Sequence, residues 1–184
     1  MKNIFVFCAG NSKARANYNT SILKPVPADT VLSAFPPERH EKLRQIQDRA
    51  GGFFTWGLGP AKRASSFWQR LTAGDVVLGF FEFHYRAVAQ LAGKEESGPL
   101  AEALWGNGTW SRILFLTKPE LVTVNASDVC PPLCSTYRGT TRISDGRTAQ
   151  ILSEYGSIAA FMERKFGFKG ATFAKLTSEE EGHP

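Results

Sequence analysis

Residues 74–91 read GDVVLGFFEFHYRAVAQL and contain the clearest strand signal in the chain. Two turn-forming residues, Gly74 and Asp75, precede a nearly continuous apolar run over residues 76–83, which is typical of a strand inside a sheet. Apolar and polar residues then alternate over residues 84–91, as they do in a strand with one buried face. Because the two runs follow one another directly, we expect them to pair as a β-hairpin.

Shorter segments on both sides of this hairpin alternate between strand-like and helix-like patterns. Further strands are expected at residues 4–8, 53–56, 110–116 and 121–124. Helices are expected at residues 13–22, 38–49, 61–71 and 147–165. Loops are expected at residues 24–36 and 137–142, and a lid or short helix at 94–102. The strands lie too close together for repeated βαβ units, so the pattern predicts an α+β fold: a small, curved mixed β-sheet or barrel flanked by helices.

The chain of 184 residues is long enough for one compact domain with an apolar core. Hydrophobic residues make up 42% of it, which excludes a disordered chain. We therefore expect a single domain over residues 1–170. Residues 171–184 have no apolar pattern and are expected to form a disordered tail, or a linker to a downstream GTPase or nuclease domain of a longer protein.

The three cysteines and three histidines indicate neither a disulfide framework nor a metal centre. The cysteine count is odd and the histidines are not at ligand spacing, so no metal site and no cofactor are expected. No apolar stretch approaches the roughly 20 residues that span a bilayer. The N-terminus is too short and too strand-like for a secretory signal, so we expect a cytoplasmic protein without a membrane partner.

The formal net charge is +5, although three glutamates gather at residues 179–181. A positive excess favours a polyanionic partner such as nucleic acid. A single basic side chain is more often merely solvated, but a set of them spread along the chain are candidate contacts to nucleic-acid phosphates. They are Lys62, Arg63, Arg86, Arg112, Arg138, Arg142 and Arg147.

Catalytic signatures are absent from the sequence. It contains no nucleophile elbow, phosphate-binding loop or zinc-protease motif. Asp75 and Glu82 share one predicted strand, but at seven positions apart they fall on opposite faces. His84 could act as an acid or base, yet a histidine at a strand end is more often simply solvated. We therefore expect a binding module without catalytic residues.

Four tryptophans lie between residues 56 and 110. Trp56 ends an apolar run and enters a Gly-rich segment, Trp105 stands in the Gly-rich stretch 104–110, and Trp110 begins a strand. Trp68 falls on the inner stripe of a predicted helix and is expected in the core. A base flipped out of its stack is held by aromatic faces and by hydrogen bonds to its edge, so Trp56, Trp105 and Trp110 are candidate walls of a base-binding cage.

The order and spacing of these segments resemble the YTH and EVE branch of the PUA-like superfamily. The resemblance covers roughly residues 50–165. It rests on the aromatic strand at 53–57, the strands at 75–83 and 87–91, the Trp-bearing loop and strand at 104–116, and a basic loop at 138–142.

This resemblance implies a β-barrel flanked by helices that binds modified bases in an aromatic cage, with Trp56 as its first wall, Trp105 as its second and Trp110 as a candidate third. Similar domains occur at the N-terminus of McrB-like restriction GTPases. The implied function is recognition of a modified base in DNA by base flipping, as the specificity domain of a modification-dependent restriction system. Methylated adenine is the first candidate base and 5-modified cytosine the second.

Two alternatives remain open at this point. An RNA-binding PUA-like module would share the same features, because the sequence does not show whether a group is placed to read the 2′-hydroxyl. A small enzyme or a plain interaction domain would use the tryptophans as core residues. Near-complete burial of Trp56 and Trp105 would favour that last class.

Overall fold

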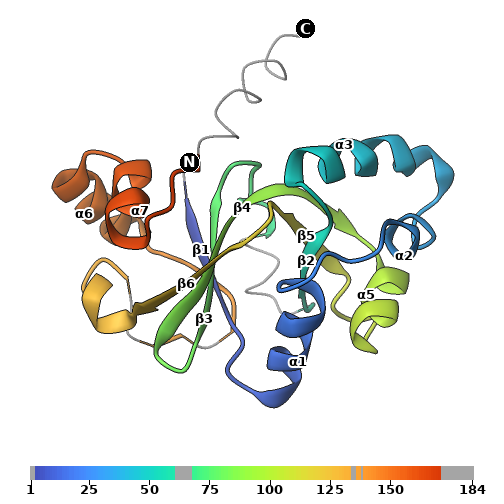
Figure 1. Cartoon of the computed structure of the whole chain (residues 1–184), viewed down its shortest axis with the longest axis horizontal. Coiled ribbons are helices and arrows are strands. Elements are labelled where there is room, and N and C mark those ends of the chain that lie inside the picture. The colour runs from blue at the N-terminus through green and yellow to red at the C-terminus, as the bar shows by residue number, and fades with distance from the viewer. Residues whose placement is uncertain (1–2, 61–67, 134–135, 138, 171–184) are drawn as a thin grey trace, which may run out of the picture.

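One curved mixed sheet forms the centre of the molecule (Figure 1). Helices pack against both halves of its outer side and along one edge. The computed structural model describes residues 3–60, 68–133, 136–137 and 139–170. Within these residues the strands are β1 (Ile4–Cys8), β2 (Phe54–Leu58), β3 (Val76–Phe81), β4 (His84–Glu96), β5 (Arg112–Leu116), β6 (Glu120–Asn125) and β7 (Thr141–Arg142). The helices are α1 (Ser12–Ser21), α2 (Ala28–Leu32), α3 (His40–Ala50), α5 (Gly98–Trp105), α6 (Asp145–Tyr155) and α7 (Ile158–Phe166), with 3-10 turns at Pro37–Arg39 and Ala126–Val129.

The long strand β4 joins the two halves of the sheet. Its first part pairs with β3 on one side and β6 on the other, which confirms the predicted hairpin. After a register shift between Leu91 and Gly93, its second part pairs with β5. A bulge of this kind bends a strand, so the sheet curves at this point. Its strand order is β2-β5-β4-β3-β1-β7, and because the described strands do not close on themselves, the sheet is open rather than a barrel.

Strand alternation divides the apolar side chains into three clusters. The inner cluster lies inside the curve and includes Phe7, Trp56, Leu91 and Leu114. A second cluster lies between the outer side of β1, β3 and β4 and the helices α6 and α7. The third, which we call the outer cluster, lies between the outer side of β2 and β5 and the helices α2, α3 and α5. The end of β2 therefore lies between the inner cluster and the outer cluster.

Several expected elements differ in detail from the structure. The predicted loop at 24–36 contains the short helix α2. The helix predicted over 147–165 is two helices, because Gly156 adopts a positive φ and Ser157 caps a new helix. Trp105 is the last residue of α5 and not part of a turn. Most of the helix predicted at 61–71 lies outside the described residues.

Candidate nucleic-acid interface

Trp56 lies on the inner face of β2 and is part of the inner cluster. Its ring stacks on Phe7, with ring centroids 4.2 Å apart and an interplanar angle of 24°. Only 7% of the residue is exposed. One face of the indole is therefore already occupied by a protein ring.

Trp105 closes α5 and packs against the opposite face of the same strand. Its ring occupies the space that a side chain at Gly57 would fill, since a Cβ there would lie 2.2 Å from the nearest ring carbon. Its Nε1 donates a hydrogen bond to the Oγ of Ser21, at 3.3 Å. Trp105 is also only 7% exposed, so contacts on three sides hold the ring.

Trp56 and Trp105 consequently lie on opposite faces of β2. Neighbouring residues of a strand point to opposite sides, and Trp105 covers the side to which Gly57 points. The two rings belong to different clusters and do not face one another across a shared space. Burial of both rings is what we expect if these tryptophans are core residues. A bound base would therefore have to contact an exposed surface beside them.

Trp110 provides such a surface. It is partly exposed, and its ring lies 6.3 Å from that of Trp105 at an angle of 58°. Gly59 leaves room for it, because a Cβ there would approach the ring to 3.4 Å. The ammonium of Lys13 lies 5.1 Å from the ring centroid, in a cation–π contact. Trp110 is thus an aromatic face backed by a second tryptophan and contacted by one exposed cation.

Ser21 ties the elements beneath this face together. Its Oγ lies 2.8 Å from the carbonyl oxygen of Thr55 and 3.0 Å from that of Asn17, and it accepts the bond from Trp105. This joins α1, β2 and α5 at a site without solvent access. The neighbouring Oγ1 of Thr55 is buried and has no hydrogen-bond partner among the described residues, which leaves an unsatisfied hydroxyl in the outer cluster.

The start of α1 adds positive charge beside Trp110. Asn11 caps this helix by accepting a hydrogen bond from the backbone N–H of Ala14. Lys13 and Arg15 follow in the first turn, which contains no acidic residue. Acidic side chains are the ones that stabilise a helix N-terminus. Two basic residues in the first turn of a helix are therefore unusual, and this could have marked Lys13 and Arg15 as phosphate contacts. The candidates chosen from the sequence did not include them.

Arg15 connects α1 to the turn between β3 and β4. Its guanidinium pairs with Glu82 at 2.9 Å and stacks 4.3 Å from the ring centroid of Phe81. Arg86, one of the predicted phosphate contacts, approaches the same carboxylate at 3.7 Å and the same ring at 5.5 Å. The two arginines and one glutamate form a partly exposed cluster with a net positive charge, which we call the hairpin cluster.

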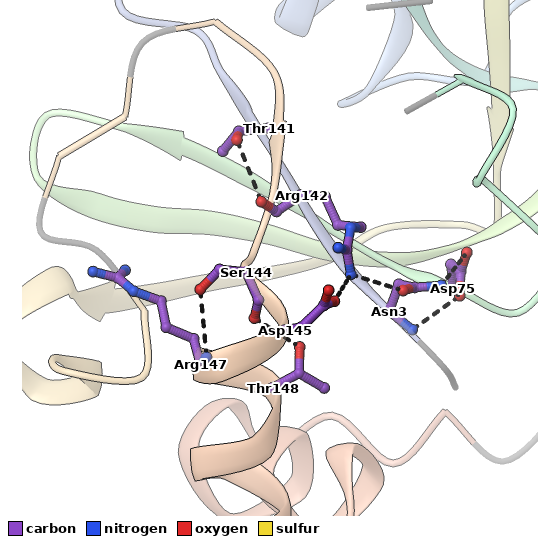
Figure 2. A network of polar contacts seen from close by, with 8 residues as sticks. All are labelled: Asn3, Asp75, Thr141, Arg142, Ser144, Asp145, Arg147 and Thr148. Carbon is purple, nitrogen blue, oxygen red and sulfur yellow. Dashed lines mark hydrogen bonds and ion pairs between the residues drawn. The ribbon is translucent and has the colours of Figure 1, made fainter. Parts of the chain in front are cut away.

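Arg142, another predicted phosphate contact, is engaged within the protein. Figure 2 shows its guanidinium between Asp145, at 2.7 Å, and the Oδ1 of Asn3, at 3.4 Å. The side chain is only 17% exposed. The guanidinium holds the pKa of Asp145 below its ordinary value, mainly through the hydrogen bond. Asn3 in turn donates to Asp75, so this network fixes β1 to β3 and α6.

The other predicted phosphate contacts are dispersed. Arg112 pairs with Glu96 at 3.2 Å at the start of β5. Arg147 lies in the first turn of α6, and in Figure 2 its side chain extends away from the Arg142 network. Lys62, Arg63 and Arg138 lie outside the described residues. The structure therefore brings Arg86 beside the unpredicted Arg15, with Lys13 in the same turn of α1 as Arg15, and leaves Arg112, Arg142 and Arg147 elsewhere.

Asp75 and Lys94 have structural partners. Asp75 accepts hydrogen bonds from the backbone N–H and the hydroxyl of Thr72, at 2.9 and 3.1 Å, besides those from Asn3. The ammonium of Lys94 donates to the carbonyls of Trp68 and Leu71, and burial lowers its pKa against the opposing effect of Asp75. Over the described part of the chain, no group of histidine, cysteine and acidic residues could hold a metal ion, and no helix has the length and apolar character needed to cross a membrane.

Comparisons with known proteins identify the fold. No protein-family model and no curated protein match the sequence. Among solved structures, the N-terminal domain of Thermococcus gammatolerans McrB bound to m5C DNA aligns over 83% of this chain and 96% of its own, with 15% identity and a TM-score of 0.61. The YTH domains of Pho92, in complex with m6A, and of Zygosaccharomyces rouxii MRB1, in complex with N6-methyladenosine RNA, each align over 83% of this chain. These two alignments cover 85% of the Pho92 domain and 86% of the MRB1 domain, with 12% and 14% identity and TM-scores of 0.43. The McrB domain confirms the predicted α+β class, and this chain has the fold of that N-terminal domain.

Proposed function

We propose that this chain binds nucleic acid and reads a modified base, and that the base stacks on Trp110 at the end of β2. The observation that carries the proposal is the Trp110 face itself. The Trp110 ring is partly exposed, is backed by Trp105 and contacts the ammonium of Lys13, on a fold shared with a domain bound to m5C DNA. Stacking on such a ring stabilises a bound base by about 1–3 kcal/mol.

Three features support this site. Lys13 already covers the Trp110 ring and can be displaced by a base, since its side chain is exposed. The carbonyls of Phe53 and Thr55 turn toward the free edge of β2, where they accept bonds from Val26 and Ser21. Strand alternation turns the backbone of Gly57 toward that same edge, close to Trp105. Because the carbonyls of Phe53 and Thr55 are already occupied, the main chain of Gly57 is the part of this edge that a base would meet.

The proposal gives the three predicted cage residues different roles. Trp110 is the wall that solvent reaches, Trp105 supports it from behind, and Trp56 fixes the strand through its stack on Phe7. Lys13, Arg15 and Arg86 would meet phosphates at the rim. The base would be flipped out of a DNA duplex, and the chain would act as the specificity domain of a modification-dependent restriction system.

Two modified bases are the candidates. The resemblance of the sequence puts methylated adenine first, whereas the solved McrB domain carries m5C DNA. A methyl group adds roughly 0.8 kcal/mol when an apolar surface desolvates it, whichever ring bears it. Both bases therefore belong in the test, together with methylated RNA for the alternative of an RNA-binding module.

The test compares wild-type protein with Trp110→Ala at one salt concentration. The probes are matched oligonucleotides with N6-methyladenine, 5-methylcytosine or no modification, each as DNA and as RNA. Wild type should prefer one modified DNA, and Trp110→Ala should lose about fivefold to hundredfold in affinity for that DNA. Leu152→Ala, which removes a 46% exposed side chain on α6, serves as the matched control. Equal binding of wild type and Trp110→Ala to every probe would overturn the proposed site, and a preference for methylated RNA would replace DNA as the partner.

A further inference from the structure

Phe83 occupies the turn between β3 and β4 in a way that folding does not require. Glu82 and Phe83 have φ values of 52° and 59°, and they are the only residues other than glycine with positive φ in the described part of the chain. A two-residue hairpin turn with positive φ at both positions strongly favours asparagine and glycine. A phenylalanine at the second position is therefore unfavourable for the local backbone.

The same residue also exposes a large apolar side chain. Phe83 is 65% exposed, although most other large apolar side chains of the described residues are buried. A strained backbone and an exposed aromatic ring at one hairpin tip both act against stability. Their coincidence points to a use in binding.

The backbone of the turn is nevertheless held firmly. The carbonyl oxygen of Phe83 accepts a hydrogen bond from the backbone N–H of Ala126 at 2.9 Å, and His84 Nδ1 lies 2.6 Å from the carbonyl oxygen of Glu82. The side chain of Glu82 is paired with Arg15 and Arg86 in the hairpin cluster. The ring of Phe83 is thus presented on a fixed support, which lowers the entropic cost of inserting it into a partner.

The turn lies on the same side of the molecule as the proposed base site. Lys13 contacts Trp110 and Arg15 pairs with Glu82, the residue before Phe83, so the first turn of α1 lies between Trp110 and the β3–β4 turn. In Figure 1 the β3–β4 turn and the start of α1 both lie at the lower end of the molecule. One duplex could contact Trp110 and Phe83 together.

We propose that Phe83 is a wedge that enters the stack of a DNA duplex beside the flipped modified base. This inference rests on the proposed function and adds the residue that fills the gap left by the extruded base. Apolar side chains inserted between base steps occur in proteins that distort DNA. Arg15 and Arg86 would contact the phosphates on either side, since the hairpin cluster is positively charged and a duplex is a polyanion.

The test measures Phe83→Ala against a modified duplex and against the same modified strand without its complement. A single strand has no gap to fill, so the wedge matters only for the duplex. Phe83→Ala should weaken duplex binding about tenfold or more and leave single-strand binding unchanged. Phe83→Leu, which keeps an apolar wedge, should restore most of the duplex affinity, and Leu152→Ala should bind both probes like wild type.

The outcomes separate this inference from the proposed function. If wild type does not distinguish modified from unmodified DNA, the proposed function fails and the wedge fails with it. If wild type discriminates but Phe83→Ala binds the duplex as Leu152→Ala does, only the wedge is refuted. An equal loss for duplex and single strand would also refute the wedge, because it would make Phe83 a general contact.

Discussion

Gly57 and Trp105 should show strong energetic coupling. A Cβ at Gly57 would lie 2.2, 2.8 and 2.9 Å from three carbons of the Trp105 ring. Carbon atoms pack at about 3.5–4.0 Å, so Gly57→Ala has to displace the ring by more than about 1 Å. The hydrogen bond to Ser21 and the contact with Trp110 oppose that shift. We expect Gly57→Ala to lower the free energy of unfolding by about 1–3 kcal/mol, as overpacking does.

A double-mutant cycle isolates this contact. In a Trp105→Ala background the ring is gone, so a methyl group at Gly57 meets empty space and its cost should vanish. The free energies of unfolding of wild type, both single variants and the double variant are measured by urea denaturation, with slopes checked for agreement. Gly51→Ala is a useful contrast: its Cβ meets nothing within 4 Å, so its strain comes from φ alone and should not depend on Trp105. Additive effects of Gly57→Ala and Trp105→Ala would refute the placement of Trp105 over the strand.

Four further predictions follow from single groups. Thr55→Val should raise the free energy of unfolding by about 1 kcal/mol in urea titrations, because it removes a buried hydroxyl without a partner among the described residues. Phe83→Gly should be more stable than Phe83→Ala by about 1 kcal/mol in the same assay, since only glycine adopts φ near 59° without cost. Lys13→Ala should reduce the salt slope of DNA binding by about one, whereas Arg142→Ala, whose guanidinium is paired with Asp145, should leave the slope unchanged. Burial raises the pKa of Tyr18 from 10.0 to about 12, against a smaller lowering by Arg86, so the unfolded chain loses this proton at a lower pH than the folded protein does. The free energy of unfolding should therefore fall as the pH rises from 10 to about 12. Tyr18→Phe should reduce this fall, as measured by denaturation at each pH.

Local sequence patterns predicted the elements that local forces define. The hairpin over 74–91 follows from turn residues and alternation, and the helix expected at 13–22 corresponds to α1. The helix expected at residues 38–49 corresponds to α3, which buries Leu43 and Ile46. The Gly-rich stretch around Trp105 was misinterpreted, because Gly106 ends a helix in a left-handed conformation and does not open a turn before it.

The candidate site depended on contacts that sequence spacing does not specify. Adjacent positions in a strand place Trp56 and Gly57 on opposite faces, but only the fold shows that Trp105 fills the space over Gly57. The hairpin cluster likewise joins Arg15 to Glu82, 67 positions away in sequence. Charge counting selects basic residues without their partners, which is why the sequence did not show that Arg142, a candidate phosphate contact, pairs with Asp145.

The most direct test of the account is the ratio of wild-type affinities for matched modified and unmodified DNA duplexes at a single salt concentration. Phosphate contacts contribute equally to both duplexes, so the ratio reports the base alone. We predict a clear preference for the duplex with N6-methyladenine or the one with 5-methylcytosine. Equal affinity for all three duplexes would contradict it.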